Sequence, residues 1–153
     1  MFTINMELSK FLVKAKIATY ASVGETNERT LEDGAKELTF EDGKFKYRDR
    51  YYGFNPFIGQ EVIFQNEKIV WSMNYYGKII SLTVSAKQIY EFLKSAMRQI
   101  KEDRPFRGPN NFKSGDFEYV DESAGDVHNF IGTERILYKR QEIYRLNYHG
   151  GSM

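Results

Sequence analysis

The stretch that decides the fold is residues 43–77, GKFKYRDRYYGFNPFIGQEVIFQNEKIVWSMNYYG, because residues 115–150, GDFEYVDESAGDVHNFIGTERILYKRQEIYRLNYHG, repeat it with one extra residue. Thirteen of 35 aligned positions are identical. The pairs are Gly43/Gly115, Phe45/Phe117, Tyr47/Tyr119, Asp49/Asp121, Gly53/Gly125, Phe57/Phe130, Ile58/Ile131, Gly59/Gly132, Glu61/Glu134, Ile63/Ile136, Asn74/Asn147, Tyr75/Tyr148 and Gly77/Gly150. Self-similarity at this level indicates an internal duplication.

A helix is predicted ahead of each copy. The first runs from Asn5 to Tyr20, with Asn5 as its cap and an apolar face made by Leu8, Phe11, Leu12, Ala15 and Ala18. The second begins at the capping box Ser85-Ala86-Lys87-Gln88, and its apolar face consists of Ile89, Phe92, Leu93, Ala96 and Ile100.

Inside each copy the apolar period changes to two, which is typical of strands. Gln65-Asn66-Glu67-Lys68 and Lys139-Arg140-Gln141 are predicted hairpin turns between such strands. The sequence therefore predicts one α+β domain over residues 1–153, made of two repeats at about 5–84 and 85–151. Each repeat is a helix plus about four antiparallel strands, as in cystatin-like units. Together they would pack two helices on a curved antiparallel sheet with pseudo-twofold symmetry.

The composition excludes several function classes. Lys and Arg number 22 against 21 Asp and Glu, a net charge of +1, so the broad positive field of a non-specific nucleic-acid binder is absent. No apolar run approaches the roughly 20 residues of a membrane span. The first ten residues lack the pattern of a secretory signal, and a chain without Cys has no disulfide and no thiol nucleophile. We expect a cytoplasmic protein with no cofactor and no membrane association.

The sequence also resembles an uncharacterised bacterial family, a domain of unknown function found alone or C-terminal to helix-turn-helix transcriptional regulators. The resemblance rests on Asn55-Pro56-Phe57-Ile58-Gly59, Met73-Asn74-Tyr75-Tyr76-Gly77, Pro105-Phe106-Arg107-Gly108-Pro109 and Tyr148-His149-Gly150-Gly151. It implies a sensing or regulatory module and provides no catalytic residue. No helix pair that reads DNA fits before Asn5, so direct nucleic-acid binding is not expected.

No motif for metal binding or nucleophilic catalysis is present. The two histidines, His128 and His149, are not at i, i+4 spacing, and no nucleophile elbow or phosphate loop appears. We therefore predict no catalytic residue and no metal ligand.

Residues that occur in both copies are interpreted as scaffold. Gly53, Gly59, Gly77 and their partners are expected at turns or at positive φ, and Asn74 and Asn147 are expected to bond backbone at strand ends. For Glu61 and Glu134 we favour bonding to glycine-rich loops; the alternative is a carboxylate pair across the pseudo-axis.

The candidate site consists of residues that are not repeated. Strand parity places Arg48, Arg50 and Tyr52 on the face opposite the core, and the same parity places Tyr76, Arg145 and His149 there. An arginine fork beside aromatic side chains suits a carboxylate or phosphate. We predict that these six residues bind an anionic ligand or an acidic segment. The alternative is that this face is solvated or buried in a dimer. Val62, Phe64, Val70 and Ile143 have the same parity, so part of the face is expected to be covered.

Three functions are consistent with these patterns. The leading hypothesis is a non-enzymatic ligand- or protein-binding regulatory module. The first alternative is a small hydrolase or isomerase that uses Glu61 and Glu134 or His149, and the second is a structural domain that dimerises through the outer sheet face. An enzyme needs a concave site with a perturbed acid or base, whereas a dimerisation domain needs an extended apolar patch.

Overall fold

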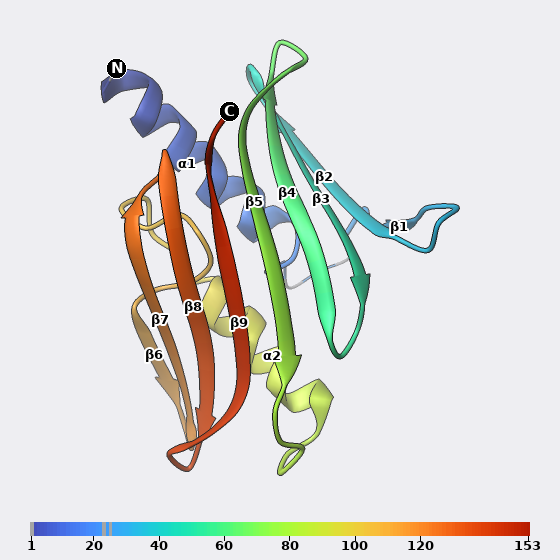
Figure 1. The fold of residues 1–153 in the computed structure, drawn as a ribbon, viewed down its shortest axis with the longest axis vertical. Coiled ribbons are helices and arrows are strands. Elements are labelled where there is room, and N and C mark those ends of the chain that lie inside the picture. Colours follow the sequence, from blue (N-terminus) through green and yellow to red (C-terminus); the bar gives the residue numbers. More distant parts are fainter. Residues whose placement is uncertain (1, 23, 25) are drawn as a thin grey trace.

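The computed structural model describes residues 2–22, 24 and 26–153, with side chains in the first helix described from Met6 onward. The described residues form two helices, α1 (Phe2–Ala18) and α2 (Ala86–Met97), and nine strands. The strands are β1 (Arg29–Thr30), β2 (Lys36–Asp42), β3 (Phe45–Gly53), β4 (Phe57–Gln65), β5 (Lys68–Ile79), β6 (Asn111–Ser114), β7 (Phe117–Asp126), β8 (Asn129–Tyr138) and β9 (Gln141–Ser152). The chain is an α+β domain, as predicted (Figure 1).

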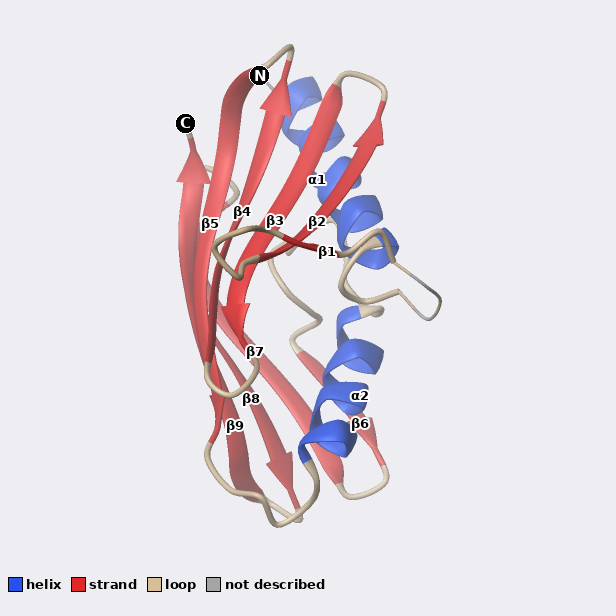
Figure 2. Cartoon of the chain, turned by 90° about the vertical axis from the view of Figure 1, so that its right-hand side faces the viewer, coloured by secondary structure: helices blue, strands red, loops and turns tan. Residues whose placement is uncertain are grey.

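All nine strands belong to one antiparallel sheet in the order β1-β2-β3-β4-β5-β9-β8-β7-β6. The order runs outward from the central pair β5 and β9, so β4 and β8, and then β3 and β7, occupy matching places on either side. The sheet is curved, and both helices lie on the same face of it (Figure 2). We call this the inner face, and the helix-free side the outer face.

Local sequence signals explain where several elements begin and end. Ser85 caps α2 in the predicted capping box with Gln88. Asn66 and Glu67 have positive φ, as do Lys139 and Arg140, the backbone that a two-residue hairpin of a right-twisted sheet requires. One boundary was predicted wrongly: α1 begins at Phe2, so Asn5 lies inside the helix and not at its cap. The Asn5 side chain is outside the described residues.

The core lies between the helices and the inner face. The predicted helix residues Phe11, Leu12, Phe92 and Leu93 are all buried there, together with Trp71 from β5. Phe92 stacks on Phe117 with ring centroids 4.9 Å apart. Two details of the α1 face differ from the prediction, because Ala18 is exposed whereas Lys16 is only 1% exposed.

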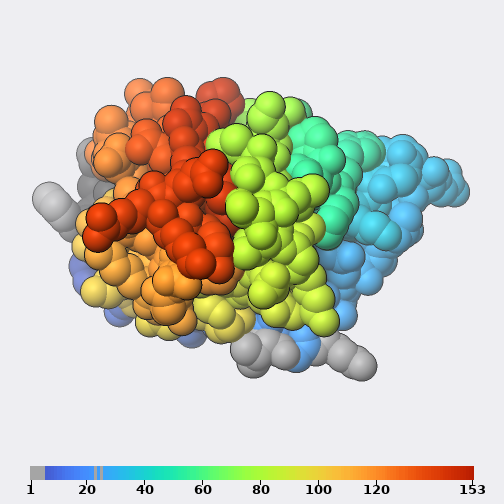
Figure 3. Space-filling view, turned by 90° about the horizontal axis from the view of Figure 1, so that it is seen from below, coloured from blue at the N-terminus to red at the C-terminus, as the bar shows by residue number. Residues whose placement is uncertain are grey.

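At one end of the molecule the segment after β5 and the β8–β9 hairpin lie side by side (Figure 3). The Ile80 amide donates to the Ile143 carbonyl at 2.7 Å, which ties this segment to β9. Neither of the two helices described above is long and apolar enough to cross a membrane.

The repeated glycines divide into two groups, which corrects the prediction that all supply turns or positive φ. Gly53 and Gly125 do have positive φ. Gly59 and Gly132 instead lie inside strands, where an added Cβ would collide with the rings of Tyr75 and Tyr148 respectively. These two glycines leave room for a tyrosine to lie across the neighbouring strand.

Candidate functional site

The six predicted site residues all lie on the outer face, as their strand parity requires, but they do not form one site. Arg50, Gln60, Asn74 and His149 follow one another in a single row across β3, β4, β5 and β9. Because neighbouring strands are about 4.8 Å apart, Arg50 and His149 are separated by roughly 14 Å. The structure therefore divides the predicted patch into parts.

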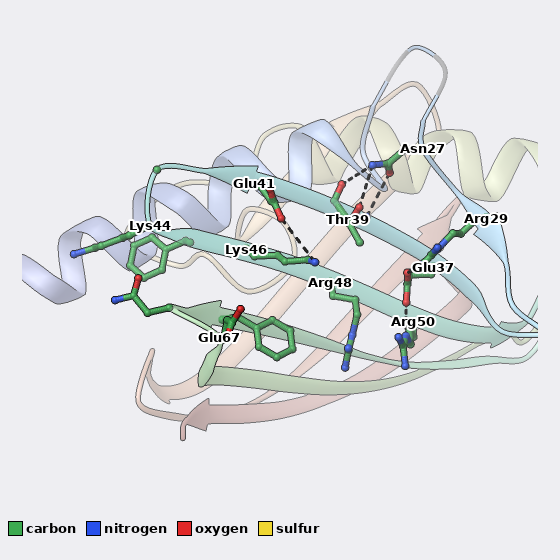
Figure 4. A pocket seen from close by; sticks show the side chains of 14 residues that line it. Asn27, Arg29, Glu37, Thr39, Glu41, Lys44, Lys46, Arg48, Arg50 and Glu67 are labelled. Atoms are coloured by element: carbon green, nitrogen blue, oxygen red, sulfur yellow. Dashed lines mark hydrogen bonds and ion pairs between the residues drawn. The ribbon is translucent and has the colours of Figure 1, made fainter.

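Arg48 and Arg50 line an open cleft on β2, β3 and β4 (Figure 4). The cleft has a volume of about 900 Å³. Glu37 is 1% exposed and binds both Arg50 and Arg29, the latter at 2.5 Å. The Arg48 guanidinium lies 5.1 Å from the centre of the Phe64 ring. Much of the positive charge predicted for this cleft is thus neutralised by a carboxylate of the same sheet.

Tyr76 and His149 line a separate shallow groove over β4, β5, β9 and β8. No Asp, Glu, Lys or Arg among the described residues lines this groove: the Asn74 amide lies 3.2 Å from His149 Nε2, and Thr133 donates to Asn147 at 3.1 Å. Both asparagines therefore bond side chains on the outer face, which corrects the prediction that they bond backbone at strand ends.

The two remaining predicted residues are engaged elsewhere. Tyr52 donates to Asp33. Arg145 forms a two-pronged ion pair with Glu142, with Nε–Oε1 and Nη2–Oε2 distances of 2.7 and 3.0 Å.

On the inner face Glu61 and Glu134 have buried basic partners, Lys16 and Arg107, which were not predicted from the sequence. Glu61 is 2% exposed and lies 3.3 Å from the Nζ of Lys16, measured at Oε1. Tyr47 donates to the same carboxylate, and Lys16 also donates to the Phe106 carbonyl. A carboxylate and an ammonium that leave water need such partners, because an unpaired buried charge costs several kcal/mol.

Glu134 has an equivalent environment on the same inner face, in the other half of the sheet. Arg107 donates two hydrogen bonds to the Glu134 carboxylate, of 3.2 and 3.0 Å. Tyr119 and Tyr144 donate to the same carboxylate at 2.6 and 2.9 Å. Glu61 and Glu134 thus have separate partners. They bond core side chains and not the glycine-rich loops that we favoured, and the structure does not bring them together as a pair.

Each glutamate instead faces an aspartate on the adjacent strand, Asp49 beside Glu61 and Asp121 beside Glu134. Tyr75 donates to Asp49 at 2.6 Å, and Tyr148 donates to Asp121 at 2.8 Å. The Tyr75 ring crosses β4 at Gly59, and the Tyr148 ring crosses β8 at Gly132. A glycine is needed at each position because a Cβ would overlap the tyrosine ring.

The two aspartates differ in their second partner. Asp121 lies 3.6 Å from the guanidinium of Arg104. Among the described residues, only the Tyr75 hydroxyl donates a hydrogen bond to Asp49, at Oδ1. Asp49 also borders a cavity of about 200 Å³ between the sheet and the helices. We call this space the inner cavity.

The walls of the inner cavity are mainly aromatic. They are formed by Tyr20, Tyr51, Phe54, Phe57, Tyr75 and Tyr90, with Asp49, Gly53, Lys94 and Arg107 completing the lining. Phe54 meets Tyr90 edge-on at a centroid distance of 5.0 Å. The hydroxyls of Tyr51 and Tyr90 are held by Glu28 and by the Phe54 carbonyl, at 2.6 and 2.5 Å. The walls are therefore fixed by packing and by hydrogen bonds.

Two cations border the same space. Arg107 is 4% exposed and its guanidinium lies 6.0 Å from the Tyr20 ring and 5.5 Å from the Tyr75 ring. The Lys94 ammonium lies 5.5 Å from the centre of the same Tyr20 ring. Arg107 uses Nε and Nη2 for Glu134, and its Nη1 has no hydrogen-bond partner among the described residues.

Two carboxyl groups of the inner face, those of Asp49 and Asp121, have raised pKa values. Burial, followed by the charge of Glu61, raises the pKa of Asp49 to about 7, against the opposing effects of Tyr75 and Arg107. Burial and Glu134 raise the pKa of Asp121 to about 6. At neutral pH Asp49 is thus able to hold or release a proton, a property common to binding and catalytic sites.

Comparisons with known proteins identify the family and no function. The family model described as Domain of unknown function (DUF5680) matches residues 49–153, a range that contains every lining residue of the inner cavity except Tyr20. No curated protein and no solved structure matches the chain. The family match covers more than half of the sequence, and the chain therefore belongs to this domain family of unknown function.

Proposed function

We propose that the chain is a small-molecule-binding module and that the ligand occupies the inner cavity. The observation that carries the proposal is that Asp49 and Arg107, both 4% exposed, line a cavity whose other walls are mainly aromatic. A pocket with mainly aromatic walls and a few convergent charged groups is typical of a small-molecule site.

An anionic group on the ligand agrees best with the charges of the cavity. Lys94 and Arg107 line it, and an oxyanion can accept from both. This proposal keeps the anionic ligand expected from the sequence and moves its site from the outer face to the inner cavity. The outer cleft, where Glu37 already pairs with Arg29 and Arg50, is the less favourable anion site.

The test is a panel of small organic anions measured by calorimetry and thermal shift on the full chain. We expect at least one member to bind wild type and to bind Lys94→Gln at least several-fold more weakly, while Arg48→Ala binds as wild type does. Arg48→Ala is the matched control because Arg48 lies on the outer face. The opposite pattern, loss with Arg48→Ala alone, would place the site in the outer cleft and refute the proposal.

A second candidate function is acid–base catalysis in the same cavity, favoured by the pKa of about 7 for Asp49. A general acid or base works best when its pKa is close to the working pH. Product analysis of each compound that binds separates this candidate from simple binding: turnover lost in Asp49→Asn supports an enzyme, and a bound compound recovered unchanged supports a binding module.

We also propose that the fold arose by duplication of a cystatin-like unit. The proposal is supported by the matching contacts of Tyr47 with Glu61 and Tyr119 with Glu134, and by the outward strand order from β5 and β9. The family resemblance supports a regulatory role in the cytoplasm of bacteria, beside or fused to a DNA-binding partner. Pull-down of helix-turn-helix proteins encoded with this chain, with and without a cavity ligand, tests that role.

A further inference from the structure

The inner face contains two aspartate–tyrosine pairs with different second partners, and this difference indicates what the cavity ligand carries. Asp121 accepts from Tyr148 at Oδ1, and the Arg104 guanidinium lies 3.6 Å from the same oxygen, while Tyr119 donates to Oδ2 at 3.5 Å. Asp49 accepts from Tyr75 at Oδ1 in the same way, has no arginine beside it at ion-pair distance among the described residues, and lines the inner cavity. By analogy with Arg104, the group that meets Asp49 from the cavity is a hydrogen-bond donor.

The rest of the cavity sets the other properties of the ligand. Lys94 and Arg107 already lie over the ring of Tyr20, and Arg107 also over that of Tyr75, so a cationic head group would meet two like charges there. The same two cations favour a carboxylate. A volume of about 200 Å³ is below the usual range of about 300–1,000 Å³ for drug-sized ligands, which suits a compound with a single ring.

We propose, resting on the inner cavity as the binding site, that the ligand is a single-ring aromatic acid with a hydroxyl or amino donor. The donor binds Asp49, the carboxylate binds Lys94 and Arg107, and the ring packs between the aromatic walls. Edge-on packing against Tyr90 and Phe57 is the arrangement these two rings already show with each other, at a centroid distance of 6.1 Å.

The donor needs Asp49 in its ionised form, and this makes binding depend on pH. The charged and titratable groups around Asp49 come from several elements: Tyr47 from β3, Glu61 from β4, Tyr75 from β5, Lys16 from α1, Tyr20 just after α1, Tyr90 and Lys94 from α2, and Arg107 from the segment after α2. Burial and Glu61 favour the neutral acid, whereas Tyr75, Arg107 and Lys16 favour the carboxylate. A hydrogen-bond donor on the ligand also favours the carboxylate, so Asp49 loses a proton when the ligand binds below about pH 7.

The experiment compares benzoate with 2-, 3- and 4-hydroxybenzoate by calorimetry on the full chain at pH 8 and pH 6. We expect one isomer to bind about 10-fold or more tightly than benzoate at pH 8, the effect of one hydrogen bond to a charged group. This advantage should shrink at pH 6 and disappear in Asp49→Asn. Lys94→Gln should weaken benzoate and the preferred isomer by the same factor, because it acts on the shared carboxylate.

A second readout uses wild type alone and remains decisive if Asp49→Asn does not fold. Titrations of the preferred isomer in two buffers of different ionisation enthalpy at pH 6.5 should show proton release, and benzoate should show less. If benzoate and its hydroxylated forms bind the cavity equally and without proton release, the ligand class is wrong while the cavity function stands. If no ring acid binds and benzylamine does, the charge assignment is wrong. If only Arg48→Ala alters binding, the proposed function itself fails.

Discussion

Tyr75 donates a 2.6 Å hydrogen bond to Asp49 although the two residues lie two strands apart, on β5 and β3. The ring crosses β4 at Gly59, where the absence of a side chain makes the contact possible. This relationship connects the glycine pattern of the sequence to the only aspartate of the described residues that borders the inner cavity.

Substitution of Gly59 by Ala is expected to destabilise the fold by about 1–3 kcal/mol, because the added Cβ overlaps the Tyr75 ring inside a packed core. The free energy of unfolding in urea measures the effect. Gly24→Ala is the control, since a Cβ at Gly24 meets nothing within 4 Å. Equal stability of the two variants would show that the ring does not need this space.

The stability of the protein should depend on the ionisation of Asp49. Its pKa is raised from 3.8 to about 7, so the folded state holds the proton more tightly than the unfolded state. This contribution is fully present below about pH 4 and is lost as pH rises through about 7, with a slope of at most about 1.4 kcal/mol per pH unit. Relative to Asp49→Asn, wild type should therefore lose stability between pH 4 and pH 7. A constant difference across this window contradicts the burial of an ionisable Asp49.

Lys16 and Glu61 should be strongly coupled. Lys16→Met leaves a buried carboxylate with one fewer partner and is expected to cost about 3–5 kcal/mol, whereas the double variant Lys16→Met, Glu61→Gln should recover much of the loss. Chemical denaturation of both single variants and the double variant completes the cycle. Lys14→Met is the control, because the Lys14–Asp42 pair is solvent-exposed. Additive losses would show that the two side chains act independently.

The hairpin turns offer a stabilising change. Glu67 has a φ of 66°, a conformation that glycine adopts without the cost of about 1 kcal/mol that a side chain carries. Glu67→Gly should therefore raise the free energy of unfolding by up to about 1 kcal/mol. Lys68→Gly, the next residue and the first of β5, should lower it. A destabilised Glu67→Gly would mean that the turn is not limited by its backbone conformation.

Sequence reasoning identified the parts of the fold that depend on local chemistry. The capping box at Ser85 and the turns at Asn66 and Lys139 are set by a few neighbouring residues, and they were predicted correctly. Strand parity also placed Arg48 and His149 on the outer face. Parity does not give the order of the strands in the sheet or the distance between them. Residues that share a face were therefore combined into one predicted site, although several strands separate them.

The buried basic residues of the inner face, Lys16 and Arg107, were not predicted because lysine and arginine are rarely fully buried. A signal was present for Lys16, which follows Leu8 and Leu12 at four-residue spacing and so continues their apolar face. Repeated polar residues at inward parity, Tyr47 and Glu61, were a second signal, since both copies keep them at core positions. No comparable signal points to Arg107, which reaches Glu134 from a loop between α2 and β6.

The segment between β5 and α2 joins two parts of the chain that are already paired along the central strands. Nine residue pairs, from Trp71 with Ser152 to Ile79 with Tyr144, connect β5 to β9. Lys16, which precedes the segment in the chain, also donates a hydrogen bond to the carbonyl of Phe106, which follows it. Leu82 within the segment is 67% exposed. A protease that cuts there would break the chain without separating the fold, and the two fragments would migrate together until denatured.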